Sequence, residues 1–102
     1  MTERHTEQIT FLWHSDWLTI RIAVIFRRNY FSGYDHLEIR SVEPEKHPLP
    51  ITETGYRSIF AVAGDIDQLG GSVEAARILL DDGAQNTNWQ QRIAEWQQPS
   101  LF

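Results

Sequence analysis

The sequence of 102 residues contains no cysteine, and this absence removes several kinds of chemistry at once. Disulfide bonds, thiolate nucleophiles and cysteine-ligated metal sites are all excluded. Long apolar segments are also missing: the longest run, Trp17–Phe26, is about half the length that crosses a bilayer and contains Arg21. Residues 1–10 are polar and of mixed charge, unlike a secretory signal. We therefore expect a cytoplasmic protein with no membrane contact.

Basic residues are few. Nine Lys and Arg stand against fourteen Asp and Glu, which gives a formal net charge of −5. Because affinity for nucleic acid depends mainly on Lys and Arg contacts with phosphates, this balance argues against direct DNA or RNA binding. It is compatible with binding to a basic protein surface, including one that normally holds nucleic acid. A protein partner is therefore expected.

Apolar residues alternate with polar ones in several stretches, which is typical of β-strands. The segment 27–35 is interpreted as a loop, because Asn29, Ser32 and Gly33 interrupt the alternation. The segment 43–55 contains three of the four prolines and is also expected to be a loop. The predicted strands are residues 8–14, 17–26, 36–42 and 56–62.

The period then changes to that of helices. Residues 72–83 are predicted to form one helix, with Ser72 as its N-cap. A second helix is predicted over residues 87–96, where Thr87 and Gln90 match a capping box. Strands followed by helices predict an α+β fold: a four-stranded, mostly antiparallel sheet with two C-terminal helices packed on one face. Residues 1–97 are predicted to form a single domain and residues 98–102 a tail; a monomer and a homodimer are both compatible with the edge strands.

The polar residues give little indication of catalysis. The four histidines, which lack the spacing of metal ligands, are expected to be exposed. If the third and fourth strands pair, a set of polar residues could converge, and a carboxylate beside a histidine could act as a general acid or base. Cross-strand ion pairs explain the same residues more simply. We therefore expect no catalysis, metal or cofactor. The histidines are His5, His14, His36 and His47, and the polar set is Asp35, His36, Glu38, Arg40, Glu53, Tyr56 and Arg57.

Aromatic residues gather in the segment 27–35, where Tyr30, Phe31 and Tyr34 follow two arginines. Base stacking would use such residues, and so would a protein interface. A third interpretation is a loop that folds its aromatic side chains over the edge of the core. The acidic net charge favours the protein interface over nucleic acid. Candidate partner-binding residues are Tyr30, Phe31, Tyr34, Glu38, Glu53 and Arg57.

The stretch HLEIRSVEPEKHPLPITETGYRSIF, followed by GG and a tryptophan-containing segment that ends in LF, has a family resemblance. It resembles an uncharacterised family of small proteins of proteobacterial plasmids and integrative elements, over roughly residues 35–102 and more loosely over the first predicted hairpin. The resemblance implies an association with mobile genetic elements but no biochemical activity. That family often has His after GYRS, where this chain has Ile59. A catalytic role of that His would therefore be absent here.

The segment Gln98–Phe102, QPSLF, resembles the pentapeptide by which bacterial replication and repair proteins bind the DNA sliding clamp. The resemblance implies that Gln98 forms a hydrogen bond at the rim of the clamp pocket and that Leu101 and Phe102 fill it. Pro99 replaces the usual Leu, which removes one apolar contact. The alternative is that Leu101 and Phe102 fold back onto the apolar face of the last helix.

These observations predict a non-catalytic protein–protein interaction protein of a mobile genetic element. In one form, the tail binds the sliding clamp. In the other, the acidic body is an anti-CRISPR or anti-restriction inhibitor, which blocks the nucleic-acid-binding surface of a host defence complex. A small hydrolase or nuclease that uses the polar set is the third alternative.

Overall fold

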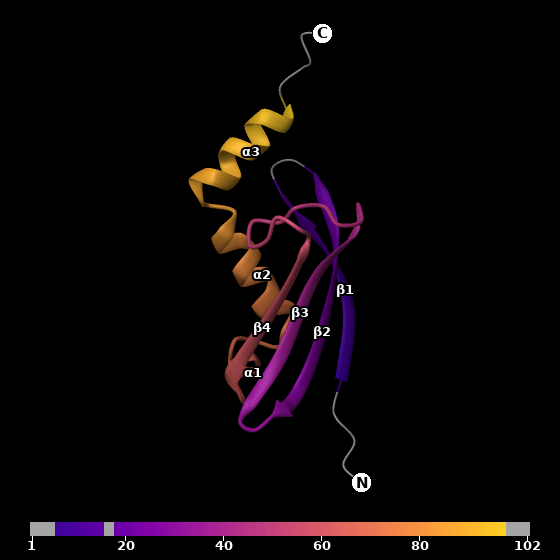
Figure 1. The fold of residues 1–102 in the computed structure, drawn as a ribbon, viewed down its shortest axis with the longest axis vertical. Coiled ribbons are helices and arrows are strands. Elements are labelled where there is room, and N and C mark those ends of the chain that lie inside the picture. The colour runs from indigo at the N-terminus through magenta and orange to yellow at the C-terminus, as the bar shows by residue number, and fades with distance from the viewer. Residues whose placement is uncertain (1–5, 16–17, 98–102) are drawn as a thin grey trace.

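The computed structural model describes residues 6–15 and 18–97 and shows one antiparallel sheet with helices on one of its faces (Figure 1). Each strand pairs with the next strand in the chain, in the order β1-β2-β3-β4. The elements are β1 (Thr6–His14), β2 (Thr19–Phe31), β3 (Tyr34–Glu43), β4 (Tyr56–Val62), α1 (Asp65–Gln68), α2 (Ser72–Gly83) and α3 (Thr87–Gln97). The predicted α+β class and four-stranded sheet are confirmed, and the short helix α1 adds to the two predicted helices.

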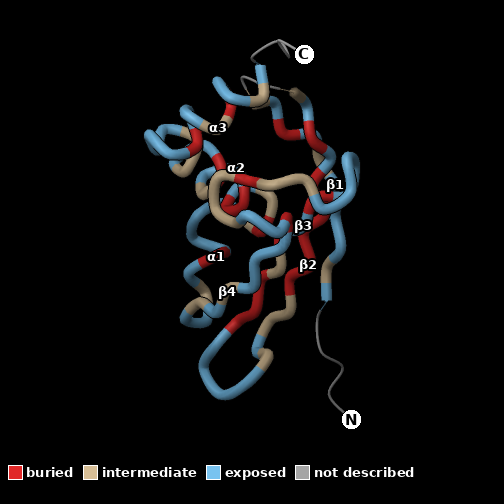
Figure 2. The backbone as a smooth tube through the Cα atoms, turned by 45° about the horizontal axis from the view of Figure 1, so that its top comes forward, coloured by how far each residue is buried: buried red, intermediate tan, exposed pale blue. Residues whose placement is uncertain are grey.

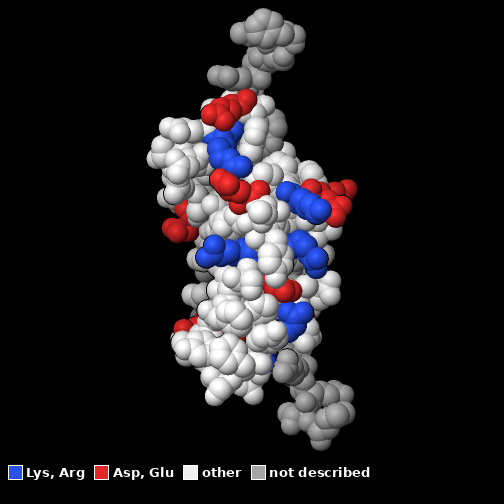
Figure 3. Space-filling model, in the orientation of Figure 1, with Lys and Arg blue, Asp and Glu red and all other residues white. Residues whose placement is uncertain are grey.

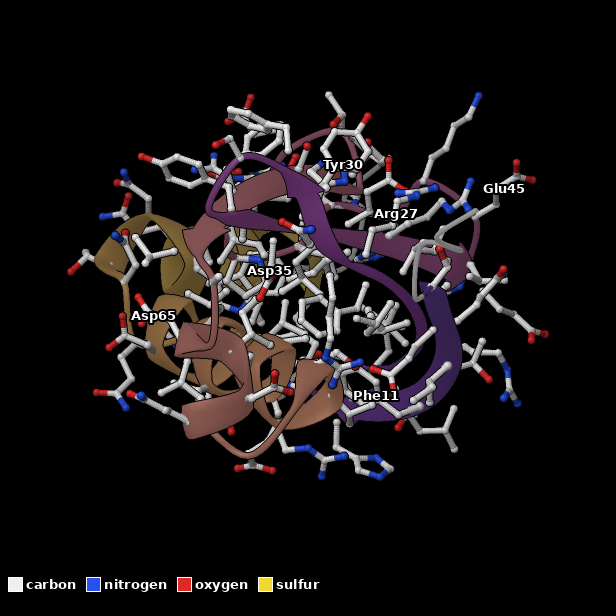
Figure 4. The ribbon with its side chains drawn as sticks, turned by 90° about the horizontal axis from the view of Figure 1, so that it is seen from below. Phe11, Arg27, Tyr30, Asp35, Glu45 and Asp65 are labelled. Carbon is white, nitrogen blue, oxygen red and sulfur yellow. The ribbon has the colours of Figure 1, made fainter. Side chains whose placement is uncertain are left out.

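The pleat of the sheet separates two sets of side chains. The register pairs Val24 with Ile39 and Phe26 with Leu37, so these residues share the face that the helices cover. They are buried together with α2 and α3 residues in one core, which follows the two central strands in Figure 2. The alternation predicted for these two strands is therefore confirmed. We call the opposite side of the sheet the open face, because none of the helices covers it (Figures 1 and 4).

The segment 27–35 is not the predicted loop. β2 continues to Phe31 and β3 begins at Tyr34, with a register shift between Arg27 and Phe31. Within this bulge Asn29 has φ 52°, so the side-chain alternation is lost although the strand continues. A tight turn at Ser32 and Gly33 then closes the hairpin, and Gly33 supplies φ 80°. The interruption of the apolar–polar alternation in the sequence therefore marks a bulge within the strand and not a loop.

The proline-rich segment 43–55 is the predicted loop, and it contributes to the core. Leu49 is fully buried, and its backbone pairs with Thr52 in an isolated bridge. Gly55 ends the loop with φ 78°, and a Cβ there would lie 2.7 Å from the carbonyl carbon of Lys46. Only glycine fits this position without a shift of the backbone.

Both predicted helices form, but neither begins with the predicted cap. Gly71 precedes α2 as its N-cap, and Ser72 is a buried helical residue. At α3, the Oδ1 of Asn86 accepts the N–H of Asn88 at 2.8 Å, so the capping side chain is Asn86 and not Thr87. The predicted apolar face of α3 is confirmed, because Trp89 and Ile93 are buried. Caps are decided by the loop geometry that precedes a helix, which the sequence pattern locates only to within a residue or two.

Asp35 is a buried carboxylate, 3% exposed, which lies between the sheet and the start of α1 (Figure 4). Its Oδ1 accepts the backbone N–H of Asn29 at 2.7 Å, and its Oδ2 accepts that of Gly64 at 3.2 Å. Both donor residues have positive φ, 52° and 92°. One side chain thus fixes the β2 bulge and the residue before α1, and so links the hairpin to the helical layer.

We expect Asp35→Ala to lower the free energy of unfolding by about 2–4 kcal/mol, because both N–H groups lose their acceptor. Asp35→Asn keeps one carbonyl acceptor and is expected to cost about half as much. Urea denaturation followed by tryptophan fluorescence measures both. Asp82→Ala, at an exposed α2 position, is the control and should stay within about 0.5 kcal/mol of the unmodified chain. Equal costs for Asp35→Ala and Asp82→Ala would contradict this assignment.

Candidate protein-binding site

A group of exposed apolar side chains lies at the end of the sheet formed by the β2–β3 hairpin. Phe31, Phe60 and Val62 are 53%, 52% and 56% exposed, and Tyr34 is also exposed. The ring centroids of Phe31 lie 5.2 Å from Tyr34 and 5.6 Å from Phe60, and those of Tyr30 and Phe60 lie 6.0 Å apart. We call Tyr30, Phe31, Tyr34, Phe60 and Val62 the aromatic patch.

Three strands bring the aromatic patch together. Tyr30 and Phe31 come from the end of β2, where the bulge changes the direction of the side chains. Tyr34 pairs with Val62, and His36 pairs with Phe60, in the β3–β4 register. Because side chains alternate along β4, Phe60 and Val62 face away from the core that receives Ile59. The patch is therefore a consequence of strand register.

Beneath the aromatic patch lies His36, which is 6% exposed rather than exposed as predicted. Its ring centroid is 4.8 Å from both the Tyr30 and the Phe60 rings. Its Nδ1 lies 3.4 Å from Nη1 of Arg27, and its Nε2 lies 2.6 Å from the Ser58 hydroxyl. Arginine only donates hydrogen bonds, so Nδ1 is the acceptor. In the neutral ring the proton is then on Nε2, which donates to Ser58.

A polar network continues from His36 along the open face. Arg27 Nη1 lies 3.3 Å from one carboxylate oxygen of Glu38, and the Tyr56 hydroxyl donates to the other at 2.8 Å. Burial acts to raise the pKa of Glu38, but the hydrogen bonds from Tyr56 and Arg27 outweigh it, and the pKa lies below its ordinary value. The bond to Glu38 raises the pKa of Tyr56, because it favours the protonated phenol.

The geometry of this network is unsuited to a serine nucleophile. A general base must accept the serine proton on its ring nitrogen. Here Arg27 occupies Nδ1 as a donor, so the neutral His36 presents an N–H to Ser58. In the described ranges 6–15 and 18–97, no three His, Asp or Glu side chains converge in a way that could hold a metal ion.

The two arginines that precede Tyr30 in β2 are already paired within the chain. Arg27 interacts with Glu38, and Arg28 donates to Asp67 at 2.7 Å. This hydrogen bond raises the pKa of Arg28 and lowers that of Asp67. Figure 3 shows a broad area without charged residues at the lower end of the molecule, over the hairpin and the end of β4. The patch is thus an apolar surface beside neutralised arginines.

The structure places the predicted site residues in several regions. Tyr30, Phe31 and Tyr34 come together in the aromatic patch, and Glu38 lies in the adjoining network. Glu53 pairs with Arg92 of α3 at 3.7 Å, away from the patch. Arg57 is exposed on β4, next to Tyr56 but on the other side of the pleat. The predicted convergence of the polar set is therefore wrong, since only His36, Glu38 and Tyr56 share the network. Gln98, Leu101 and Phe102 lie outside the described residues.

Four residues of the site were not among the predicted site residues. Phe60 and Val62 belong to the patch, and Arg27 and Ser58 belong to the network. The signal was available in part, because alternation in β4 puts the three β4 residues opposite the inward Ile59. Their proximity to the β2 aromatic residues depends on the β2–β3–β4 register, which the sequence pattern does not specify.

Comparison with known families matches residues 11–89 to the family described as the KlcB third domain. The chain belongs to this family. KlcB is a plasmid-associated protein, which agrees with the plasmid part of the resemblance drawn from the sequence motif. The KlcB third-domain match includes the aromatic patch and the polar network and ends before Gln98–Phe102. No curated protein and no solved structure matches the chain significantly. In the described part of the chain, no helix has the length and apolar character needed to cross a membrane.

The pKa directions of Glu38 and Tyr56 predict how stability depends on pH. The ionised Glu38 stabilises the fold fully above the ordinary glutamate pKa of 4.5, and this contribution is lost as pH falls through the lower folded value. The protonated Tyr56 stabilises it fully below 10.0, and this contribution is lost as pH rises through the higher folded value.

Between pH 4.5 and pH 10.0, we expect Tyr56→Phe to lower the free energy of unfolding by about 0.5–1 kcal/mol. At alkaline pH, the variant should lose less stability with rising pH than the unmodified chain. At acid pH, Glu38→Gln should lose less stability with falling pH than the unmodified chain. Urea denaturation at a series of pH values tests both. Glu43→Gln removes an exposed ion pair with Arg21 and is the control, with little expected change. Unchanged pH profiles in Tyr56→Phe and Glu38→Gln would refute the assignment.

Proposed function

We propose that this domain is a non-catalytic protein-interaction module of a plasmid-associated protein family, and that it binds a protein partner through the aromatic patch. The observation that carries this proposal is the exposure of Phe31, Phe60 and Val62 in one contiguous group. Aromatic side chains are the usual anchors of protein interfaces. Contiguous exposed apolar side chains on a small chain are typical of a binding surface.

The environment of the patch supports a protein rather than a nucleic-acid partner. Nucleic acid binding needs cations that are free to contact phosphates. The nearby Arg27 and Arg28 are held by Glu38 and Asp67. Apolar side chains of a partner protein need no such cations. The stacked contacts between Phe31 and Tyr34 also make the patch a preformed surface, which lowers the entropy cost of binding.

The polar network supports a non-catalytic role. The polar groups that a hydrolase would use already form hydrogen bonds with one another: Glu38 accepts from Arg27 and Tyr56, and His36 donates to Ser58. These contacts hold the strands in register beneath the patch. The network therefore fits a support for the binding surface.

We expect the double substitution Phe31→Ser and Phe60→Ser to weaken partner binding at least tenfold, because each removes a buried anchor of the complex. A photo-reactive residue at position 34 should first cross-link the partner in plasmid-bearing cells, and calorimetry with the purified partner then measures the affinity. The control is Leu12→Ser with Ile78→Ser, two comparably exposed apolar residues outside the patch. Equal losses in the two double variants would contradict the proposal.

In a finer form of the proposal, Gln98, Leu101 and Phe102 of the C-terminal motif bind the sliding clamp. The same binding experiment tests this form. Deletion of residues 98–102 should abolish clamp binding and leave binding through the aromatic patch intact. If the deletion leaves clamp binding unchanged, the clamp form is wrong. If the deletion alone abolishes all partner binding, the patch is not the binding surface.

The inhibitor alternative has its own supporting observation in the helical layer. Between Asp65 and Gly83 the chain contains five carboxylates and one arginine, a net charge of −4 out of −5 for the whole sequence. Such a layer could cover a basic surface that normally binds nucleic acid in a host defence complex.

The triple substitution Asp65→Asn, Glu74→Gln and Asp82→Asn tests this alternative. If the domain is an inhibitor, we expect these changes to slow association with the defence complex and to reduce the salt dependence of the association rate. Surface plasmon resonance at several salt concentrations measures both. If the triple variant still inhibits and the Phe31→Ser and Phe60→Ser double variant does not, inhibition depends on the aromatic patch instead.

A further inference from the structure

β4 is an edge strand, and its hydrogen-bonding pattern can be worked out from two bonds at its ends. Ser41 N–H donates to Gly55 C=O at 2.8 Å, and Ala63 N–H donates to Gly33 C=O at 2.9 Å. The β3–β4 register runs without a shift between these bonds. Bonded and non-bonded pairs alternate in an antiparallel ladder. The bonded residues of β4 are therefore 57, 59 and 61, and the backbone groups of residues 56, 58, 60 and 62 point outward.

These outward groups are largely unpaired. Among the described residues, only the Tyr56 carbonyl has a partner on this edge, from the Thr52 and Thr54 hydroxyls at 2.8 and 3.3 Å. No hydrogen bond within the described ranges reaches the outward N–H or C=O groups of Ser58, Phe60 or Val62. Unpaired strand edges of this kind accept a further strand.

β4 has few of the devices that usually protect an edge. Its seven residues, YRSIFAV, include no proline and no lysine, the register has no bulge, and Arg57 is the single charged residue. Two of its outward residues, Phe60 and Val62, are also exposed members of the aromatic patch. The other edge strand differs, because the same alternation from the Ser15 N–H to Leu18 C=O bond makes its outward residues mainly polar: Thr6, Gln8, Thr10, Leu12 and His14. An added strand thus fits the more apolar edge of β4 better than the mainly polar edge of β1.

We propose that β4 pairs antiparallel with β4 of a second copy of this chain, so that two sheets form one continuous eight-stranded sheet. The strand is self-complementary in the register that puts Ile59 on the two-fold axis. In this register Tyr56 faces Val62 of the other copy and Ser58 faces Phe60, so all four outward residues find hydrogen-bonding partners.

Side-chain size and charge support a second copy of the chain as the partner that pairs with β4. The large Phe60 lies opposite the small Ser58, which leaves room for its ring. Arg57, the single charged residue of β4, lies opposite Ala61, so no like charges face each other. The Phe60 residues of the two copies are diagonal neighbours, with Cα atoms about 7–8 Å apart, which is within reach of aromatic side chains. Pairing would therefore join the two aromatic patches into one surface.

The expected dimer is weak. A single pair of seven-residue edges buries less surface than the roughly 1,200–2,000 Å² of a standard stable interface. Dimerisation should therefore depend on protein concentration, with a dissociation constant in the micromolar to millimolar range.

Sedimentation velocity of the full chain up to about 1 mM tests the proposal. The weight-average mass should rise with concentration from 11.9 kDa towards twice that value. Ser58→Pro removes an outward N–H and leaves the β3 ladder intact, and it should weaken dimerisation at least tenfold. Thr10→Pro makes the same change on β1 and is the control, with no effect on the dimer expected.

Two further variants keep the test decisive if a proline variant does not fold. Phe60→Lys brings two lysines together across the axis, and we expect a weaker dimer that high salt partly restores. Ile59→Cys uses the absence of cysteine from the chain. Its two thiols would lie on the axis, where the Cα atoms of a non-bonded pair are about 4.5 Å apart, and should form an intermolecular disulfide under oxidation.

Arg57→Cys is the register control, because its two copies would be about 13 Å apart along the strands and should not cross-link. A monomer at every concentration up to about 1 mM would overturn the proposal. So would a dimer that Thr10→Pro disrupts and Ser58→Pro does not. Phe31→Ser changes the patch away from this edge and should leave dimerisation intact, so failure of the dimer and failure of partner binding are distinguishable.

Discussion

The alternation of side chains across β3 is the constraint on which both the core and the candidate site depend. Leu37 and Ile39 enter the core from this strand, whereas His36 and Glu38, their neighbours in sequence, form the network on the open face. A shift of one residue in this register would exchange the two sets. The β3 pairings with β2 and β4 therefore fix the hydrophobic core and the support of the aromatic patch together.

The two ends of the sheet differ in the way their side chains are held. At the hairpin end, Asp35 fixes the backbone of the β2 bulge, and the ring of His36 contacts those of Tyr30 and Phe60. At the other end, the proline-rich loop and α3 close the core, with the Trp13 ring 6.2 Å from that of Trp89. The side chains at the end with the aromatic patch are thus held by hydrogen bonds and ring contacts although they are exposed. A preformed apolar surface suits binding to a protein.

The open face brings together residue types that are common in active sites. A histidine, a serine, a glutamate and a tyrosine lie within hydrogen-bonding distance of one another or of Arg27. The donor character of Arg27 changes their chemistry, because it directs the His36 proton towards Ser58. The proximity of catalytic residue types is therefore a weaker indication of function than the direction of the hydrogen bonds between them.

The periodicity of the sequence was enough to predict the α+β class and the division of the β2, β3 and β4 residues between the two faces of the sheet. Alternation of apolar residues follows directly from the pleat, and β4 was predicted with its observed bounds, residues 56–62. The caps of α2 and α3 and the bulge at Asn29 were missed, because they depend on local backbone angles that many residues can adopt.

By itself, the sequence determined how the residues of each strand divide between its two faces, since the period of a strand depends on local geometry alone. Only the tertiary structure decided that Phe31, Tyr34 and Phe60 meet, that His36 is buried among them, and that Glu53 is remote from Glu38. These relations depend on the pairing of strands separated along the chain, which is set by the packing of the whole sheet on its helices.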